Sequence, residues 1–183
     1  RSSDLHIGAE RLYIVWGDKP EYWQLVDSKE ESHFAKIAEL QSVCWLQIEG
    51  LFKNVNAGTY ELIWRIELPS VSAANFDCAW TATSQDYDRK TLVELSKLSH
   101  GKNPEWAQPL IGEGWFELTV GKFSLSEPVP IIEAKMFGGN SYWFRDLRVD
   151  YVELRPVDPT TPVAESYPEI KMESDPDILE AYR

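Results

Sequence analysis

Hydrophobic and polar side chains alternate along much of the chain. In residues 59–68 the apolar side chains share one face, and they are Tyr60, Leu62, Trp64, Ile66 and Leu68. A half-buried antiparallel strand requires this period of two. Six further segments show apolar runs of strand length: residues 12–16, 43–52, 76–83, 115–123, 131–137 and 147–154. Turn-forming residues lie between several of them, so the pattern predicts an all-β sandwich or barrel.

Two segments depart from this period and predict short helices. Ser28 and Glu31 have the spacing of a capping box, and apolar residues follow at helical intervals, which predicts a helix near residues 29–40. Leu92, Leu95 and Leu98 are three residues apart, which favours one helical turn over an irregular strand. The expected fold class is therefore all-β with one or two short helices.

The charge balance narrows the range of partners. The 30 acidic and 18 basic residues give a net charge of −12 over 183 residues. Nucleic acids and anionic membranes are bound through Lys and Arg, so neither is an expected partner. No apolar run approaches the roughly 18 residues that a membrane-spanning helix needs. With 43% apolar residues, the chain has enough material for a packed core.

The chain divides into one domain, residues 5–157, and a tail, residues 158–183. The tail holds seven acidic and two basic side chains and no sustained apolar period, which predicts a flexible acidic segment. The alternative is that Tyr167 or Ile170 docks on the domain. Cys44 and Cys78 are expected to be reduced and buried in strands. No N-glycosylation acceptor occurs, which fits a cytoplasmic protein or one shared between cytoplasm and nucleus.

Signatures of catalysis are missing from the sequence. His6, His33 and His100 lie in unrelated contexts without metal-ligand spacing, and no nucleophile elbow or phosphate loop occurs. Acidic residues are so numerous that a close pair of carboxylates carries little information. We therefore expect no enzymatic activity, no metal site and no cofactor.

The tryptophans fall into groups. Trp45, Trp64 and Trp80 lie within alternating segments and are expected in the core, whereas the pattern assigns no role to Trp106 and Trp115.

Trp16 and Trp23 flank a turn that also contains Asp18, Glu21 and Tyr22. Flat aromatic faces beside carboxylates suit a pyranose ring, whose C–H face stacks while its hydroxyls seek acceptors. Core packing of both indoles is the alternative.

Several segments, in order, resemble the phloem protein 2 lectins, the Nictaba-type plant lectins. The opening motif is LYIVWGDKPEYW in residues 12–23, and the later blocks are residues 34–40, 43–50, 57–61, 114–123 and 152–156. The resemblance covers about residues 5–157. It implies a jelly-roll-like β-sandwich that binds N-acetylglucosamine oligomers and N-glycan cores without catalysis. In such lectins the two tryptophans of the opening motif matter for sugar binding, and they match Trp16 and Trp23.

The same family also supplies the substrate-recognition domain of plant F-box proteins. Residues 34–40 and 43–46 are especially similar to that branch. An F-box upstream of Arg1 would make the chain part of a ubiquitin-ligase adaptor whose sugar site is degenerate. The sequence thus leaves two partners open, a glycan or glycoprotein and a protein substrate, and it leaves open a homodimer.

One loop departs from the family pattern. The family loop reads Trp-Lys-x-Gly-Leu, whereas residues 143–147 read WFRDL, with Asp146 in place of the glycine. This loss is expected to alter the geometry of the loop. Tyr142 and Trp143 either extend the sugar platform or pack in the core.

Overall fold

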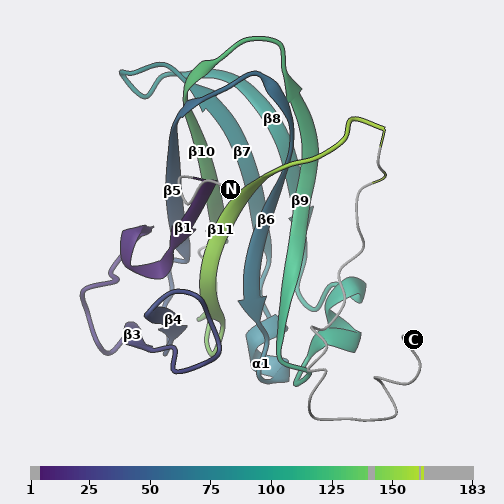
Figure 1. The fold of residues 1–183 in the computed structure, drawn as a ribbon. Helices are drawn as coiled ribbons and strands as arrows, with labels where there is room; N and C mark the ends of the chain where they lie inside the picture. Colours follow the sequence, from purple (N-terminus) through teal and green to yellow (C-terminus); the bar gives the residue numbers. More distant parts are fainter. Residues whose placement is uncertain (1–4, 140–142, 161, 163–183) are drawn as a thin grey trace.

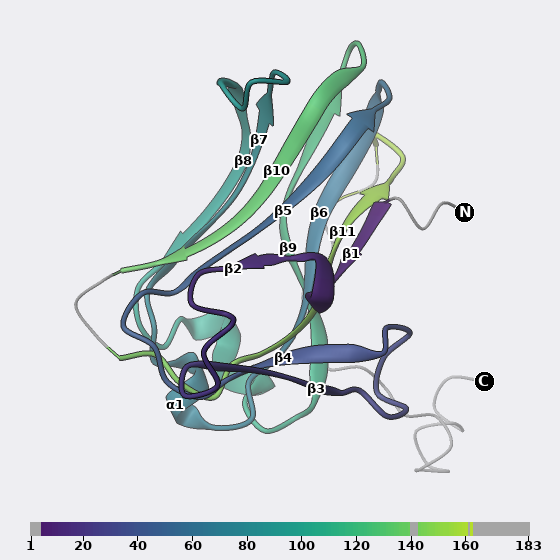
Figure 2. The same cartoon turned by 90° about the vertical axis from the view of Figure 1, so that its left-hand side faces the viewer.

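Two antiparallel sheets form the protein. The computed structural model describes residues 5–139, 143–160 and 162, and Figures 1 and 2 show the two sheets packed face to face. The first sheet has the order β3 (Trp23–Asp27), β4 (Lys36–Leu40), β11 (Arg148–Pro156), β6 (Gly58–Glu67) and β9 (Trp115–Leu125), with β1 (His6–Gly8) also on β11. The second has the order β2 (Tyr13–Ile14), β5 (Gln47–Val55), β10 (Val129–Gly138), β7 (Cys78–Gln85) and β8 (Thr91–His100).

The described part of the chain also contains three short helices: η2 (Ala9–Arg11), α1 (Val71–Ala74) and η3 (Glu105–Leu110). The expected all-β, jelly-roll-like sandwich with short helices is confirmed, although the helices lie elsewhere than predicted. None of the helices among the described residues is long and apolar enough to cross a membrane.

The core lies between the two sheets. Trp64 on β6 and Trp80 on β7 are fully buried, and their rings meet edge to face with centroids 5.9 Å apart. Their predicted core role is confirmed. Burying such large rings supplies a major share of the hydrophobic stabilisation of a sandwich.

Trp45 was expected in this core, and that prediction is wrong. Residues 43–46 are not yet strand but the connection into β5, where Val43 forms an isolated bridge with Phe144. Val43 and Leu46 point inward and are fully buried, whereas the side chain of Trp45 is 39% exposed. Cys44 in the same connection is half-buried, so only Cys78 on β7 matches the expected buried strand thiol; both cysteines are free. Burial raises the pKa of the Cys78 thiol.

The predicted helix at residues 29–40 is also wrong. Residues 28–35 form a closed loop, in which Ser28 Oγ donates to Phe34 O at 2.5 Å and Ala35 O accepts from Ser28 N at 2.9 Å. β4 follows, paired with β3 and β11. Glu31 turns its carboxylate to Trp115 and Arg148 instead of capping a helix. Tertiary partners therefore outweigh the local capping signal.

The segment with Leu92, Leu95 and Leu98 is strand β8, so the favoured helical turn is wrong as well. β8 pairs with β7, and the register shifts between Ala82 and Thr83 and again between Ser84 and Gln85. A bulge adds one residue to a strand, which lets side chains three apart share a face. Leu95 and Leu98 accordingly pack against the core, whereas Leu92 is exposed.

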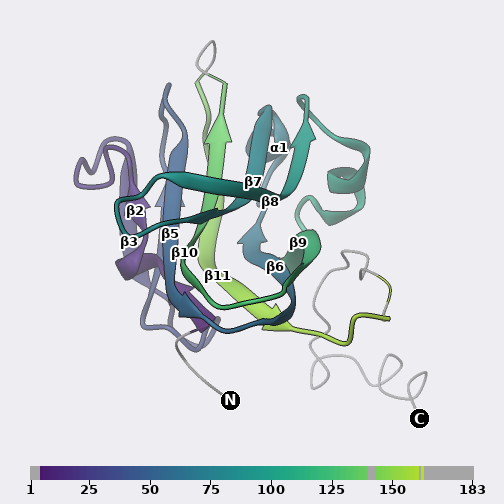
Figure 3. The ribbon, with the colours of Figure 1, turned by 90° about the horizontal axis from the view of Figure 1, so that it is seen from above.

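The two ends of the sandwich differ. The β5–β6, β7–β8 and β9–β10 connections lie together at the top of Figure 1, while α1, β3 and β4 lie toward the bottom. Seen from above in Figure 3, β2 and β3 lie beside β5, on the side away from β9. The opening motif is thus held at one flank of the sandwich, near the end opposite the hairpin tips.

Candidate functional site

A compact turn links β2 to β3. Three backbone hydrogen bonds, each between residues three apart, hold it: Gly17 N donates to Ile14 O at 2.9 Å, Lys19 N to Trp16 O at 3.1 Å, and Tyr22 N to Lys19 O at 2.9 Å. A side chain on Gly17 would bring its Cβ within 2.9 Å of the Cβ of Ile14, so the turn needs glycine at this point. This turn shortens the strand expected at residues 12–16 to Tyr13–Ile14.

Trp16 projects from this turn at the surface. Its backbone has a φ of 60°, in the left-handed region that non-glycine residues rarely adopt, and its side chain is 43% exposed. The indole packs on the ring of Tyr22, with centroids 5.1 Å apart and planes tilted by 32°. Strained backbone of this kind persists only where neighbouring contacts fix it. The turn therefore presents a fixed, half-open aromatic face.

A cavity of about 450 Å³ lies beside the turn. Its walls combine apolar and polar side chains from η2, β2, the turn, β3 and β4, and they are Ala9, Glu10, Leu12, Tyr13, Ile14, Gly17, Asp18, Trp23, Gln24, Leu25 and Ala38. A partly apolar cavity with a few polar groups is the usual form of a small-molecule site. Of the predicted site residues, Asp18 and Trp23 line it; Glu21 is exposed on the turn and is not part of its wall.

Trp23 holds a different position from the one expected. It is the first residue of β3, lies opposite Leu40, and is only 2% exposed. Its ring therefore has no open face for stacking, and the predicted stacking role is wrong. Trp23 instead forms part of the cavity wall, and its Nε1 finds no hydrogen-bond partner among the described residues. Sequence alternation missed this because β3 itself has no clear period of two.

Asp146 stands where the family pattern has glycine, and its backbone has a glycine-like conformation. Asp146 has a φ of 71°, the left-handed conformation that glycine favours and aspartate tolerates. Asp146 N donates to Leu40 O at 2.9 Å, and Ser70 Oγ donates to its carboxylate at 3.1 Å. Trp143 is 55% exposed, which excludes the core alternative for that residue. Tyr142 lies outside the described residues.

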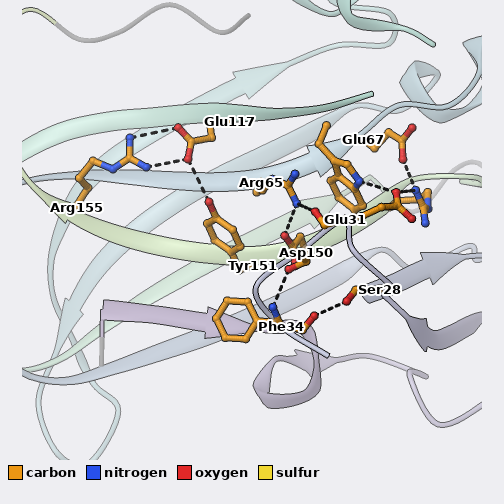
Figure 4. Close-up of polar contacts among 12 residues, drawn as sticks. Ser28, Glu31, Phe34, Arg65, Glu67, Glu117, Asp150, Tyr151 and Arg155 are labelled. Carbon is orange, nitrogen blue, oxygen red and sulfur yellow. Dashed lines mark hydrogen bonds and ion pairs between the residues drawn. The ribbon is translucent and has the colours of Figure 1, made fainter. Parts of the chain in front are cut away.

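A second polar region covers the outer face of the first sheet, and Figure 4 shows its contacts. Arg65 on β6 donates to the carboxylate of Asp150 at 2.6 Å and to Glu31 O at 2.8 Å. Ser32 donates to the other oxygen of Asp150 at 2.5 Å. Asp150 is fully buried and Arg65 nearly so. These contacts tie the loop of residues 28–35 onto the sheet.

Two further arginines organise the carboxylates of this face. Arg148 pairs with Glu31, Glu39 and Glu67, and it lies with Arg65 near the ring of Trp115, 5.1 Å and 4.8 Å from the centroid. Burial alone would lower the pKa of Arg148, but its carboxylate partners outweigh burial and raise it.

Arg155 binds Glu117 and Glu153, and Tyr151 donates to Glu117 at 3.1 Å. Burial, and then the nearby carboxylates, raise the pKa of Tyr151. Glu31, Glu117, Asp150 and Tyr151 also line a polar cavity of about 380 Å³. The carboxylates named here are joined to arginines, so this face stabilises the sheet.

Two exposed aromatic residues near the turn were missed by sequence reasoning. Tyr13 lines the cavity and is 64% exposed, although it falls in an apolar run. Trp45 was assigned to the core. The inward Val43 and Leu46 are three residues apart, a spacing that indicates irregular backbone and that could have indicated an outward Trp45.

Curated relatives of the chain are plant F-box and phloem proteins. The chain is 26% identical to the F-box protein PP2-B10 of Arabidopsis thaliana over 126 residues, which cover 65% of this chain and 46% of that protein. It is 26% identical to the putative F-box protein PP2-B12 of the same plant over 163 residues, or 82% of this chain and 60% of that protein. The chain thus spans about half the length of these relatives.

The fold is shared with a carbohydrate-binding module, and the sequence with a plant family. A family 35 carbohydrate binding module from Clostridium thermocellum superposes with a TM-score of 0.50 and 13% identity, covering 83% of this chain and 98% of that one. This likeness concerns the fold alone. The model of the Phloem protein 2 family matches residues 3–156, most of the chain. On this evidence the chain belongs to the phloem protein 2 family.

Proposed function

We propose that the chain is a non-catalytic lectin that binds N-acetylglucosamine oligomers and the cores of N-linked glycans. The observation that carries this proposal is the half-exposed Trp16, packed on Tyr22 beside a cavity of about 450 Å³. Membership of the phloem protein 2 family and the fold shared with a carbohydrate-binding module support it.

The chemistry of the turn suits a sugar. The exposed face of Trp16 stacks on the C–H face of a pyranose ring, an interaction that excludes water from two apolar surfaces. Asp18 on the cavity wall accepts hydrogen bonds from hydroxyl or amide groups, and Glu21 and Tyr22 on the turn supply further polar atoms. The exposed Trp143 extends the platform in this proposal.

Trp16 and Trp23 should respond differently to mutation. Glycine adopts the left-handed backbone of residue 16 without strain, so Trp16→Gly should keep the fold and lose stacking, weakening binding by about tenfold or more. Trp23→Ala should instead lower the free energy of unfolding by about 3–5 kcal/mol, because it removes a buried ring. Intrinsic fluorescence titration with chitotriose measures the first effect, and urea unfolding measures the second.

Tyr87→Ala serves as the control for Trp16→Gly. Tyr87 is an exposed aromatic residue in the β7–β8 connection, at the other end of the sandwich, and should leave binding unchanged. An unchanged emission spectrum of the parent protein at millimolar chitotriose would overturn the proposed function. Equal affinities of Trp16→Gly and the parent would overturn the site.

A second candidate function is the recognition of a protein substrate. The F-box relatives, of which the chain spans about half, favour this alternative. In that case the chain would bind its partner without sugar, as the substrate-reading part of a ubiquitin-ligase adaptor. Full retention of a protein partner by Trp16→Gly in a pulldown would favour it over the lectin.

A cytoplasmic or nucleocytoplasmic location also belongs to this proposal. The free thiols of Cys44 and Cys78 fit a reducing compartment. Fluorescence microscopy of the tagged full-length protein in plant cells would test it, and a signal confined to the secretory pathway would contradict it.

A further inference from the structure

Trp45 places a large apolar ring at the surface of the protein and not in its core. Its side chain is 39% exposed and meets the ring of Phe137 edge to face, with centroids 5.9 Å apart at 77°. Aromatic pairs in this geometry favour each other beyond the area they bury. The indole is therefore held in place from one side while another part of its surface stays open.

Polar side chains complete a closed set of contacts around this pair. Trp45 Nε1 donates to Gln47 Oε1 at 2.9 Å, and Gln47 Nε2 donates to Glu49 Oε1 at 3.2 Å. Lys135 Nζ lies 3.7 Å from the same Glu49 oxygen and 5.5 Å from the centroid of the Phe137 ring. We call Trp45, Gln47, Glu49, Lys135 and Phe137 the Trp45 cluster. Each member contacts two others, so the cluster is ordered before any ligand arrives.

The Trp45 cluster lies on the outer face of the second sheet. Gln47 pairs in register with Phe137, and Glu49 with Lys135, across the β5–β10 ladder, so all four side chains point to the same face. The neighbouring Ile48 and Met136 point inward and are fully buried. The cluster is thus a patch of the open face and no extension of the core.

The patch is continuous with the proposed sugar site. Tyr13 on β2 pairs in register with Glu49, which places its exposed ring beside the Trp45 cluster, and Tyr13 also lines the cavity next to the turn. The pairing continues past the strand, because Val15 N donates to Gln47 O at 3.0 Å. Trp16 is the next residue. Tyr13 therefore joins the two aromatic surfaces across one pair of strands.

We infer that the Trp45 cluster is a second carbohydrate subsite, which takes a further ring of an oligosaccharide whose first ring lies on Trp16. This inference rests on the proposed function and adds to it the place where a further ring of the oligomer binds. The indole of Trp45 offers a stacking face. Beyond its two contacts among the described residues, the amide of Gln47 has a second N–H and a second lone pair on its oxygen, and Lys135 and Glu49 supply a donor and an acceptor for hydroxyl groups.

The length of the sugar distinguishes the two subsites. The probes are chitobiose and chitohexaose, titrated calorimetrically against the intact protein. Trp45→Ala should weaken binding of chitohexaose by about tenfold, equal to about 1.4 kcal/mol, and leave chitobiose unchanged. Trp16→Gly should weaken the binding of both sugars, because every ligand contacts the first subsite.

Two further variants make the result decisive. Gln47→Ala leaves both rings in place but removes the partner of the indole N–H, and it should weaken chitohexaose binding by a smaller factor. Tyr87→Ala, an exposed aromatic residue at the other end, should change neither sugar. Thermal unfolding of each variant confirms that it is folded.

The outcomes separate the inference from the proposed function. If the parent binds both sugars and Trp45→Ala binds chitohexaose as the parent does, the second subsite is refuted while the lectin function stands. If Trp45→Ala weakens both sugars equally, Trp45 belongs to a single site, and the length-dependent subsite is also refuted. If the parent binds neither sugar, the proposed function fails and the inference fails with it.

Discussion

His100 is a half-buried side chain whose hydrogen bonds depend on its protonation state. Its Nε2 accepts from Trp80 Nε1 at 2.9 Å, so the proton of the neutral ring is on Nδ1, which donates to Gly101 O at 2.8 Å. Phe76 and Trp106 pack on the ring edge to face. Burial lowers the pKa of His100, although the Gly101 carbonyl and Asp77 act in the opposite direction.

Stability should therefore fall on the acid side of neutrality. As the pH falls, His100 in the unfolded chain takes up its proton near pH 6.5, at a higher pH than in the folded protein. The contribution of neutral His100 to the free energy of unfolding is therefore fully present above that pH. This contribution is lost as the pH falls from about 6.5 through the lowered pKa of His100 in the folded protein. His100→Gln retains an acceptor for Trp80 and should reduce the difference in unfolding free energy between about pH 7.5 and about pH 5.5. Urea unfolding at both values measures it.

His33→Gln is the matched control, because His33 is exposed in the loop of residues 28–35. The acidic residues add their own pH dependence, which both variants share with the parent. If His100→Gln lost as much stability as the parent on acidification, protonation of His100 would not be the cause of the loss.

Single residues also show where sequence reasoning ends. Alternation placed Trp64 and Trp80 correctly, because both lie in long regular strands. It failed for Trp45 and Trp23, which stand at the boundary between a connection and a strand. There the side chain direction is set by tertiary contacts, such as the bridge between Val43 and Phe144, and local periodicity says nothing about them.

The loop of residues 28–35 shows how an element gains its shape from a distant partner. The sequence signal at Ser28 and Glu31 indicated a helix, yet Ser32 and Glu31 bond to Asp150, Trp115 and Arg148 more than 80 residues away. The spacing of residues within the loop gives no information about Asp150, whose buried carboxylate lies under the loop. The buried pair of Arg65 and Asp150 holds the loop to the sheet.

Breaking this pair should be costly. Arg65→Met removes the cationic partner of a fully buried carboxylate and should lower the free energy of unfolding by about 3–5 kcal/mol. Lys36→Met is the control on the neighbouring β4, because Lys36 forms a solvent-exposed pair with Asp27, and its loss should leave the free energy of unfolding nearly unchanged. Urea unfolding measures both. Equal losses of unfolding free energy in the two variants would contradict this prediction, because they would show that the burial of Asp150 does not make the loss of its partner more costly.

The whole fold was more predictable than its parts. The alternation of residues 59–68 places strand β6, and the ordered family blocks imply the sandwich. The position of each edge strand does not follow. β3 and the two-residue β2 are too short to show a period, and β8 hides its period behind two register shifts. The candidate site lies around β2 and β3, so the sequence could locate its residues but could not show which way their side chains point.

The net charge of −12 separates the two candidate functions at the scale of the molecule. An N-acetylglucosamine oligomer is uncharged, so stacking on Trp16 and Trp45 should be insensitive to salt. Binding of a basic protein partner would instead depend on the negative charge of this protein, and therefore on salt. Raising the ionic strength from about 0.01 M to about 1 M shortens the Debye length from about 30 Å to about 3 Å.

We therefore expect the affinity for chitotriose to change less than about twofold over this range, because screening acts on charges and leaves ring stacking intact. Fluorescence titration in sodium chloride measures it, and Trp16→Gly provides the baseline for stacking-independent binding. A tenfold loss of affinity at high salt would mean that charge dominates binding. In that case the acidic surface, and not the aromatic face around the turn, would be the part of the molecule that selects its partner.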